Sequence, residues 1–192
     1  MRKPNNQARK PDERVRRTHQ RLGFALLALI QEKSYGEVTV RQILQRAKVG
    51  RSTFYLHYRD KNDLLLSQLE KFSEIMSTAL SVRKERSSRV VPVEEMFAHI
   101  AEQMPLYRAL KRADRLNDFF ELAQVYFARG IAQRLAESGR LAKCSKREME
   151  IRATALAGSL LSLLRWWLDR GTKEPPKAMD EMFHQMVWKG VG

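Results

Sequence analysis

Apolar residues recur at spacings of three and four along most of this 192-residue chain, which is the pattern of amphipathic helices. No segment alternates apolar and polar residues for long enough to predict a strand. The pattern predicts helices over residues 13–33, 40–47, 53–58, 61–80, 93–103, 106–112, 119–138, 146–169 and 177–188. The predicted fold class is therefore all-α.

The first of these helices has a broad apolar stripe and a strongly basic first half. The stripe is expected to be buried, and its members are Val15, Leu22, Phe24, Ala25, Leu26, Leu27, Leu29 and Ile30. The basic residues are Arg14, Arg16, Arg17 and Arg21. Gly36 is predicted to act as the C-cap, because glycine adopts left-handed backbone angles without steric cost.

The stretch from residue 38 to 66 has the pattern of two short helices joined by a tight turn, followed by the start of a third. Thr39 and Asp60 are N-cap candidates for the first and third helices, and Ser52 or Thr53 for the second. Two short helices with basic and hydroxyl residues on the second are typical of a helix-turn-helix.

The same stretch resembles the DNA-binding signature of TetR-family transcriptional regulators, over roughly residues 14–72. The matching positions are Thr39, Ile43, Ala47, Val49, Ser52, Thr53, Phe54, Tyr55, His57, Tyr58, Lys61, Leu64 and Leu65. Lys48 departs from the pattern, because the family more often has glycine there, and we expect Gly50 to absorb the bend. The resemblance implies an N-terminal three-helix helix-turn-helix DNA-binding domain followed by a C-terminal helical dimerisation and ligand domain.

Nine residues of this stretch are candidates for contact with DNA. They are Thr39, Arg41, Arg51, Ser52, Thr53, Tyr55, His57, Tyr58 and Lys61. Arg51 is suited to specify sequence, because its guanidinium can donate two hydrogen bonds to a guanine edge. The resemblance makes Tyr58 and Lys61 phosphate contacts, whereas Phe54 and Leu56 are expected in the core. A purely structural role is the alternative at each candidate position.

Positive charge is concentrated in the first part of the chain. Residues 1–72 hold 16 Lys and Arg against 7 Asp and Glu, within a net charge of +14. This imbalance favours a polyanionic partner at that end. The predicted organisation is a flexible basic arm over 1–12, the helix-turn-helix domain over 13–62, and a helical domain for dimerisation and effector binding over 63–192.

The last two predicted helices are candidates for self-association. Small residues within 146–169 would allow a partner helix to approach closely, and apolar residues on both helices would supply buried area. The candidate interface residues are Leu156, Leu160, Leu163, Trp167, Met182, Phe183 and Met186. The resemblance implies such a homodimer, and burial of these side chains within one subunit is the alternative.

Regulators of the resembled family generally sense a small molecule with the C-terminal domain. Aromatic and methionine side chains with a few polar groups are typical of such pockets. The candidate effector-pocket residues are Phe97, Ile100, Met104, Tyr107, Tyr126 and Trp166. Ordinary core packing is the alternative, because the same residue types at helical spacing also form cores.

No pattern in the sequence predicts catalysis, a cofactor or a metal site. The four histidines are far apart, and the single cysteine, Cys144, excludes a Cys-based zinc cluster. No apolar run is long enough to span a membrane, and none follows the basic start as in a secretory signal. The expected location is the cytoplasm, with no membrane partner.

The sequence therefore predicts a homodimeric, sequence-specific DNA-binding transcriptional regulator with a double-stranded DNA operator as its partner. A repressor released by a small-molecule effector is the favoured mode, and an activator of the same family is the nearest alternative. A non-specific basic nucleic-acid-binding protein would explain the charge but not the helix-turn-helix.

Overall fold

The computed structural model describes residues 9–139, 141 and 144–189, with only the backbone described for residues 9–12. Across these residues the chain forms nine α-helices, one short 3-10 helix and no strand. The elements are α1 (Arg9–Glu32), η1 (Tyr35–Glu37), α2 (Val40–Ala47), α3 (Arg51–His57), α4 (Lys61–Val82), α5 (Val93–Glu102), α6 (Met104–Arg112), α7 (Leu116–Glu137), α8 (Lys146–Asp169) and α9 (Pro176–Lys189). None of the helices in the described part combines the length and the apolar character that crossing a membrane requires.

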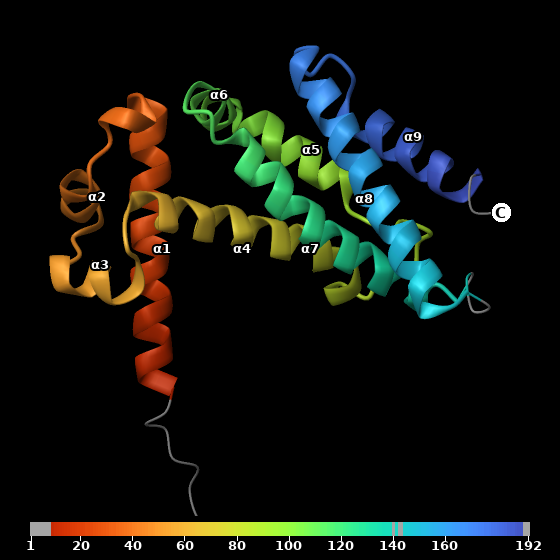
Figure 1. Ribbon diagram of the computed structural model, residues 1–192, viewed down its shortest axis with the longest axis horizontal. Coiled ribbons are helices and arrows are strands. Elements are labelled where there is room, and N and C mark those ends of the chain that lie inside the picture. Colours follow the sequence, from red (N-terminus) through yellow and green to blue (C-terminus); the bar gives the residue numbers. More distant parts are fainter. Residues whose placement is uncertain (1–8, 140, 142–143, 190–192) are drawn as a thin grey trace, which may run out of the picture.

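The helices form two groups that share α4 (Figure 1). α1, α2 and α3 pack together at one end of the molecule, and α4 runs from this group into a bundle of α5 to α9. Within the bundle α7 packs against both α4 and α8, while α5 packs against α9. α6 lies next to the C-terminal half of α1, so the bundle touches the first group through α6 as well as through α4.

α1 begins at Arg9, four residues before the predicted start of the first helix at residue 13. Pro11 falls in the first turn, where the N–H groups of a helix have no intrahelical partner and proline is tolerated. The rest of the predicted arm, residues 1–8, lies outside the described residues. Residues 9–12, which were predicted to belong to a flexible arm, are therefore helical.

The apolar stripe of α1 is buried, except that Leu27 is half-buried and two predicted positions are exposed. Leu22, Leu26 and Ile30 are fully buried, whereas Phe24 is 72% exposed and Val15 is 40% exposed. Each residue of a helix is rotated by about 100° from the one before it. Phe24 therefore points away from the face that packs against α2 and α4, and its predicted burial is wrong.

Close helix packing and a buried polar cluster hold the bundle together. A Cβ at Gly130 of α7 would lie 2.1 Å from the carbonyl oxygen of Ser77 on α4, so these two helices are in close contact only because this position is glycine. The loop after α4 is attached to α9 by Arg89, which donates a hydrogen bond of 2.9 Å to Asp180. Burial raises the pKa of Asp180, but the hydrogen bond from His184 and the charge of Arg89 outweigh burial, and the pKa stays below its usual value.

Candidate DNA-binding surface and internal cavity

The turn between α2 and α3 differs from the prediction in which residue bends the backbone. Thr39 caps α2 as predicted, because its side chain accepts a hydrogen bond from the N–H of Gln42. Lys48 takes the left-handed conformation (φ 50°, ψ 49°), while Gly50 is extended (φ −70°, ψ 152°). The expectation that Gly50 absorbs the bend is therefore wrong. The Lys48 carbonyl accepts a hydrogen bond of 2.8 Å from Arg21, which ties the turn to α1.

Two further capping predictions are corrected nearby. α3 begins at Arg51 with Gly50 as its N-cap and without a capping side chain, so Ser52 and Thr53 lie inside the first turn. Gly36 lies within η1, whose N-cap is Ser34, and its φ is not positive. The prediction that Gly36 is the C-cap of α1 is therefore wrong. Because capping does not engage the hydroxyls of Ser52 and Thr53, they remain free for other partners.

One side of α3 is buried and the other is open. Phe54 is fully buried, as predicted, and it anchors α3 against α1 and α2. Arg51, Ser52 and Tyr55 are exposed, and the Arg51 guanidinium lies 5.6 Å from the centre of the Tyr55 ring. Leu56 was expected in the core but is 78% exposed. Two residues along a helix point to nearly opposite sides, so burial of Phe54 places Leu56 outside.

α2 contributes to the same surface. Thr39 and Arg41 are exposed at its N-terminal end. A hollow of about 430 Å³ separates α2 from α3. It is lined by Val40, Arg41, Leu44, Gln45, Val49, Arg51 and Tyr55. Two arginines and one tyrosine thus border a depression between the two helices of the motif.

The side chains of Tyr58 and His57 both contact His19 of α1. Tyr58 is 5% exposed and its hydroxyl forms a hydrogen bond of 2.7 Å with Nδ1 of His19. The half-buried His57 ring lies 4.6 Å from the His19 ring. Burial and the neighbouring His57 lower the pKa of His19, so its neutral Nδ1 can accept the Tyr58 proton donor. The resemblance implied a phosphate contact for Tyr58, but its hydroxyl is engaged inside the domain.

Lys61 also has an internal role. Its ammonium donates hydrogen bonds to the carbonyl oxygens of Tyr35 (2.7 Å), Val38 (2.9 Å) and Gly36 (3.3 Å). A lysine ammonium has three N–H groups, so these acceptors use all of them. Asp60 caps α4 as predicted, because its carboxylate accepts hydrogen bonds from the backbone N–H groups of Asn62 and Asp63. These N–H groups at the start of α4 were expected to favour an anion. The side chain of Lys61 therefore stabilises η1 and the entry to α2, and its contact with phosphate stays a prediction.

The last two helices expose apolar side chains, but only some of these residues are ones that were predicted to form the interface. The large apolar side chains that are at least two-fifths exposed on α8 and α9 are Ile151, Trp166, Met182 and Met186. Leu156 and Leu163 are half-buried. Leu160, Trp167 and Phe183 are at most 1% exposed within one protomer, so their prediction as interface residues is corrected. The Trp167 indole donates to the carbonyl of Glu174, which fixes it inside.

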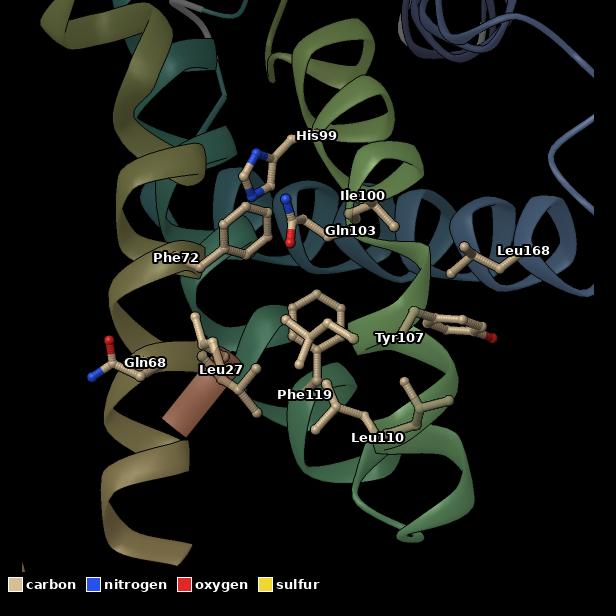
Figure 2. A pocket seen from close by; sticks show the side chains of 13 residues that line it. Leu27, Gln68, Phe72, His99, Ile100, Gln103, Tyr107, Leu110, Phe119 and Leu168 are labelled. Carbon is tan, nitrogen blue, oxygen red and sulfur yellow. The ribbon is translucent and has the colours of Figure 1, made fainter. Parts of the chain in front are cut away.

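A mainly apolar cavity of about 160 Å³ lies where α1, α4, α5, α6, α7 and α8 meet (Figure 2). It is lined by Leu27, Gln68, Leu69, Phe72, His99, Ile100, Gln103, Leu106, Tyr107, Leu110, Leu116, Phe119 and Leu168. Ile100 and Tyr107 were among the candidate effector residues. The cavity also includes Leu27 of α1, which no pattern within the C-terminal segment could have indicated.

The other four candidate pocket residues lie elsewhere. Phe97 is buried against Trp167, with ring centres 4.8 Å apart. Tyr126 donates a hydrogen bond to Glu70, and Trp166 is 44% exposed on α8. Met104 packs on the core without lining the cavity. Helical periodicity places these residues on the apolar faces of their helices, but it does not indicate which neighbouring helices those faces contact.

Two family models match the chain. Residues 25–67 match the model described as bacterial regulatory proteins, tetR family, and residues 92–189 match the model described as a transcriptional regulator C-terminal region. The second match alone covers about half of the chain. The two matches correspond to the two groups of helices.

Individual relatives are more distant. The chain is 24% identical over 185 residues to YxbF, an uncharacterised HTH-type transcriptional regulator of Bacillus subtilis, which covers 92% of this chain and 46% of the relative. An uncharacterised HTH-type regulator of Mycobacterium bovis is 36% identical over 62 residues, covering 32% of this chain and 29% of that protein. The chain therefore spans less than half the length of these relatives.

Two solved structures have the same fold. The dihydroxyacetone kinase operon activator DhaS has a TM-score of 0.70 and 16% identity, with 91% of this chain and 96% of that chain covered. The fatty acid degradation regulator FadR from Bacillus halodurans has a TM-score of 0.62 and 17% identity, with 91% and 95% covered. At such low identities the likeness shows the fold alone.

Proposed function

The chain belongs to the TetR family of bacterial regulatory proteins, and we propose that it is a homodimeric cytoplasmic repressor, bound to a specific DNA operator and released by a small molecule. The observation that carries the proposal is the open face of α3, where Arg51, Ser52 and Tyr55 are exposed while Phe54 holds the helix in place. A short helix with this distribution fits a major groove.

The proposed contacts follow from the exposed groups. Arg51 reads a guanine edge through two hydrogen bonds, and Tyr55 packs on a neighbouring base or phosphate. Thr39 and Arg41, at the start of α2, contact the DNA backbone. Ser52, Thr53 and His57 add hydrogen bonds at the rim of the same surface. Tyr58 and Lys61 support the surface from inside.

The proposed dimer forms through the exposed apolar residues of α8 and α9. These helices lie on the far side of the bundle from α2 and α3, so pairing through them leaves both recognition surfaces free (Figure 1). Two recognition helices can then occupy half-sites about one DNA turn apart, roughly 34 Å. Two-fold symmetry of the protein predicts a palindromic operator.

Release is proposed to act through the cavity, because its wall includes α1 and α4 as well as the bundle. A ligand shifts the protein away from DNA only by binding the DNA-incompetent arrangement more tightly. A cavity shared by the DNA-binding helices and the bundle changes shape when one group moves against the other, which provides that difference in affinity.

An activator is the second candidate, since the structurally similar DhaS is named an operon activator. The same DNA-binding surface serves both modes, so transcription itself must be measured. Run-off transcription from a template with the selected operator is expected to decrease when the protein is added. An increase would assign the activator mode.

The first test is selection of bound duplexes from a random DNA pool at about 150 mM salt. We expect an enriched palindrome. Arg51→Ala should relax the preference at one base pair of each half-site, while Arg129→Ala, with the same charge change on α7, should leave the preference unchanged. Binding that is equal for all duplexes and disappears as salt rises would indicate the non-specific basic protein instead.

A further inference from the structure

We propose that the cavity between the DNA-binding helices and the bundle binds a small, uncharged, aromatic molecule that carries one hydrogen-bond acceptor, and that Gln103 recognises this acceptor. The inference names the ligand class of the effector site, and in that respect it rests on the proposed function. The size of the cavity, the chemistry of its wall and the position of Gln103 each support it.

The size of the cavity limits the ligand. Its volume is about 160 Å³. An apolar cavity of about 150 Å³ in another protein stays free of water and binds benzene. A ligand of one six-membered ring with small substituents therefore fits.

The wall of the cavity excludes a charged ligand. Among the described residues that line it there is no Lys, Arg, Asp or Glu. Burial raises the pKa of Tyr107, so its hydroxyl is neutral at neutral pH. A charged group entering here would lose its hydration, and its one possible counter-ion among the described lining residues would be His99, an exposed side chain that stacks on Phe72. The rings of Phe72 and Phe119, 6.2 Å apart, offer faces and edges on which another aromatic ring can pack.

Gln103 supplies directional polarity at one end of the cavity. Figure 2 shows its amide beside His99 and Phe72, between the end of α5 and the start of α6. Its carbonyl oxygen accepts a hydrogen bond of 3.4 Å from Gln31 of α1. A glutamine amide also has two N–H donors. A ligand with an acceptor group can engage these donors, which is why the ligand class includes one acceptor.

The same residue connects the cavity to the DNA-binding helices. A ligand that reorients the Gln103 amide competes with the hydrogen bond from Gln31, and the ligand also contacts Leu27 on α1. α1 in turn holds the turn of the helix-turn-helix through Arg21 and the Lys48 carbonyl. Occupation of the cavity therefore changes how α1 sits against α6 and, through α1, the position of the turn.

Fluorine NMR on the full chain tests the ligand class with four single-ring probes. We expect saturable binding of 4-fluorophenol and of 4-fluoroanisole, whose oxygen can only accept, about fivefold weaker binding of fluorobenzene, which lacks the acceptor, and no saturable binding of 4-fluorobenzoate at the same concentrations. Binding of the benzoate as tight as that of the phenol would overturn the inference. So would the absence of saturable binding for all of the neutral probes.

Two variants test the site itself. Gln103→Leu should remove the preference for 4-fluorophenol over fluorobenzene while leaving both bound. Ile100→Phe should fill the cavity and abolish binding of both, whereas Met104→Phe, which adds an aromatic ring next to the cavity wall but outside it, should not. Unchanged binding in Ile100→Phe, or an unchanged preference in Gln103→Leu, contradicts the proposal. Far-UV circular dichroism and thermal unfolding establish that each variant is folded.

The DNA experiment separates the two proposals. Selection of an operator by the ligand-free protein, together with no binding of the neutral probes, overturns the ligand class and leaves the DNA-binding proposal intact. Binding of the probes without any selected operator overturns the DNA-binding proposal and supports the cavity chemistry. With both present, saturating 4-fluorophenol is expected to weaken operator binding.

Discussion

Leu56 exposes an apolar side chain on the face of α3 that also presents Ser52 and Tyr55. In a major groove such a side chain can pack on the C5-methyl group of thymine. We expect wild-type protein to bind an operator with thymine roughly fourfold tighter than one with uracil at the contacted position, because one methyl group is buried. Leu56→Ala should remove this difference. A thymine preference that survives the substitution would assign it to another residue.

Lys61 shows how a residue of a DNA-binding signature can act from inside the domain. We expect Lys61→Met to lower the free energy of unfolding by about 2–4 kcal/mol, because it leaves carbonyl oxygens without their charged donor. Arg59→Met is the control, since the Arg59 side chain is 88% exposed and should change stability little. Urea unfolding measures both. If Lys61→Met weakens DNA binding at unchanged stability, the phosphate role implied by the resemblance is restored.

At the scale of elements, α4 and α7 pack so closely that the contact leaves no room for a side chain at Gly130. We expect Gly130→Ala to destabilise the protein by about 1–3 kcal/mol, because the new Cβ meets the Ser77 backbone and a helix must move. Gly158→Ala on α8 is the matched control. Its new Cβ would lie 3.8 Å from the nearest atoms, so we expect it to be neutral or stabilising by up to about 1 kcal/mol. Thermal unfolding of both variants compares them, and equal stability would argue against close packing at Gly130.

The sequence predicts elements best where their determinants are local. The helix predicted over 146–169 has the same bounds in the structure, and Thr39 and Asp60 cap helices as expected, because each N-cap depends on neighbours within three residues. The left-handed residue was expected at Gly50, although the glycine that the resembled family has at position 48 was itself a signal for Lys48. The hydrogen bond from Arg21 that ties this turn to α1 comes from 27 positions away and has no local signal.

The candidate sites were less predictable for the same physical reason. Periodicity marks Trp166 and Trp167 alike as large apolar residues of α8, yet the first is 44% exposed and the second 1%. Which of the two reaches another subunit depends on how α8 packs against α5 and α7, and this is a tertiary property. The cavity likewise combines Leu27 with residues more than forty positions further along the chain.

At the scale of the whole molecule, the exposed apolar face of α8 and α9 should decide the oligomeric state. We expect Met182→Glu to give a monomer that remains folded, because the residue is 49% exposed in the protomer. Val82→Glu, at an exposed position of α4, should remain a dimer. Light scattering after gel filtration measures the mass of each. A dimeric Met182→Glu protein would locate the interface elsewhere, and a monomeric one should bind a palindromic operator far more weakly.

α4 is a single unbroken helix of 22 residues that starts next to the recognition helix and ends inside the bundle. At about 1.5 Å per residue it is roughly 33 Å long, so a tilt of about 5° at one end displaces the other by about 3 Å. Successive base pairs are about 3.4 Å apart. A tilt this small leaves the hydrogen bonds within α4 intact, yet it shifts the recognition helix by almost one base step. In the proposed dimer the two-fold axis doubles the mismatch with the operator.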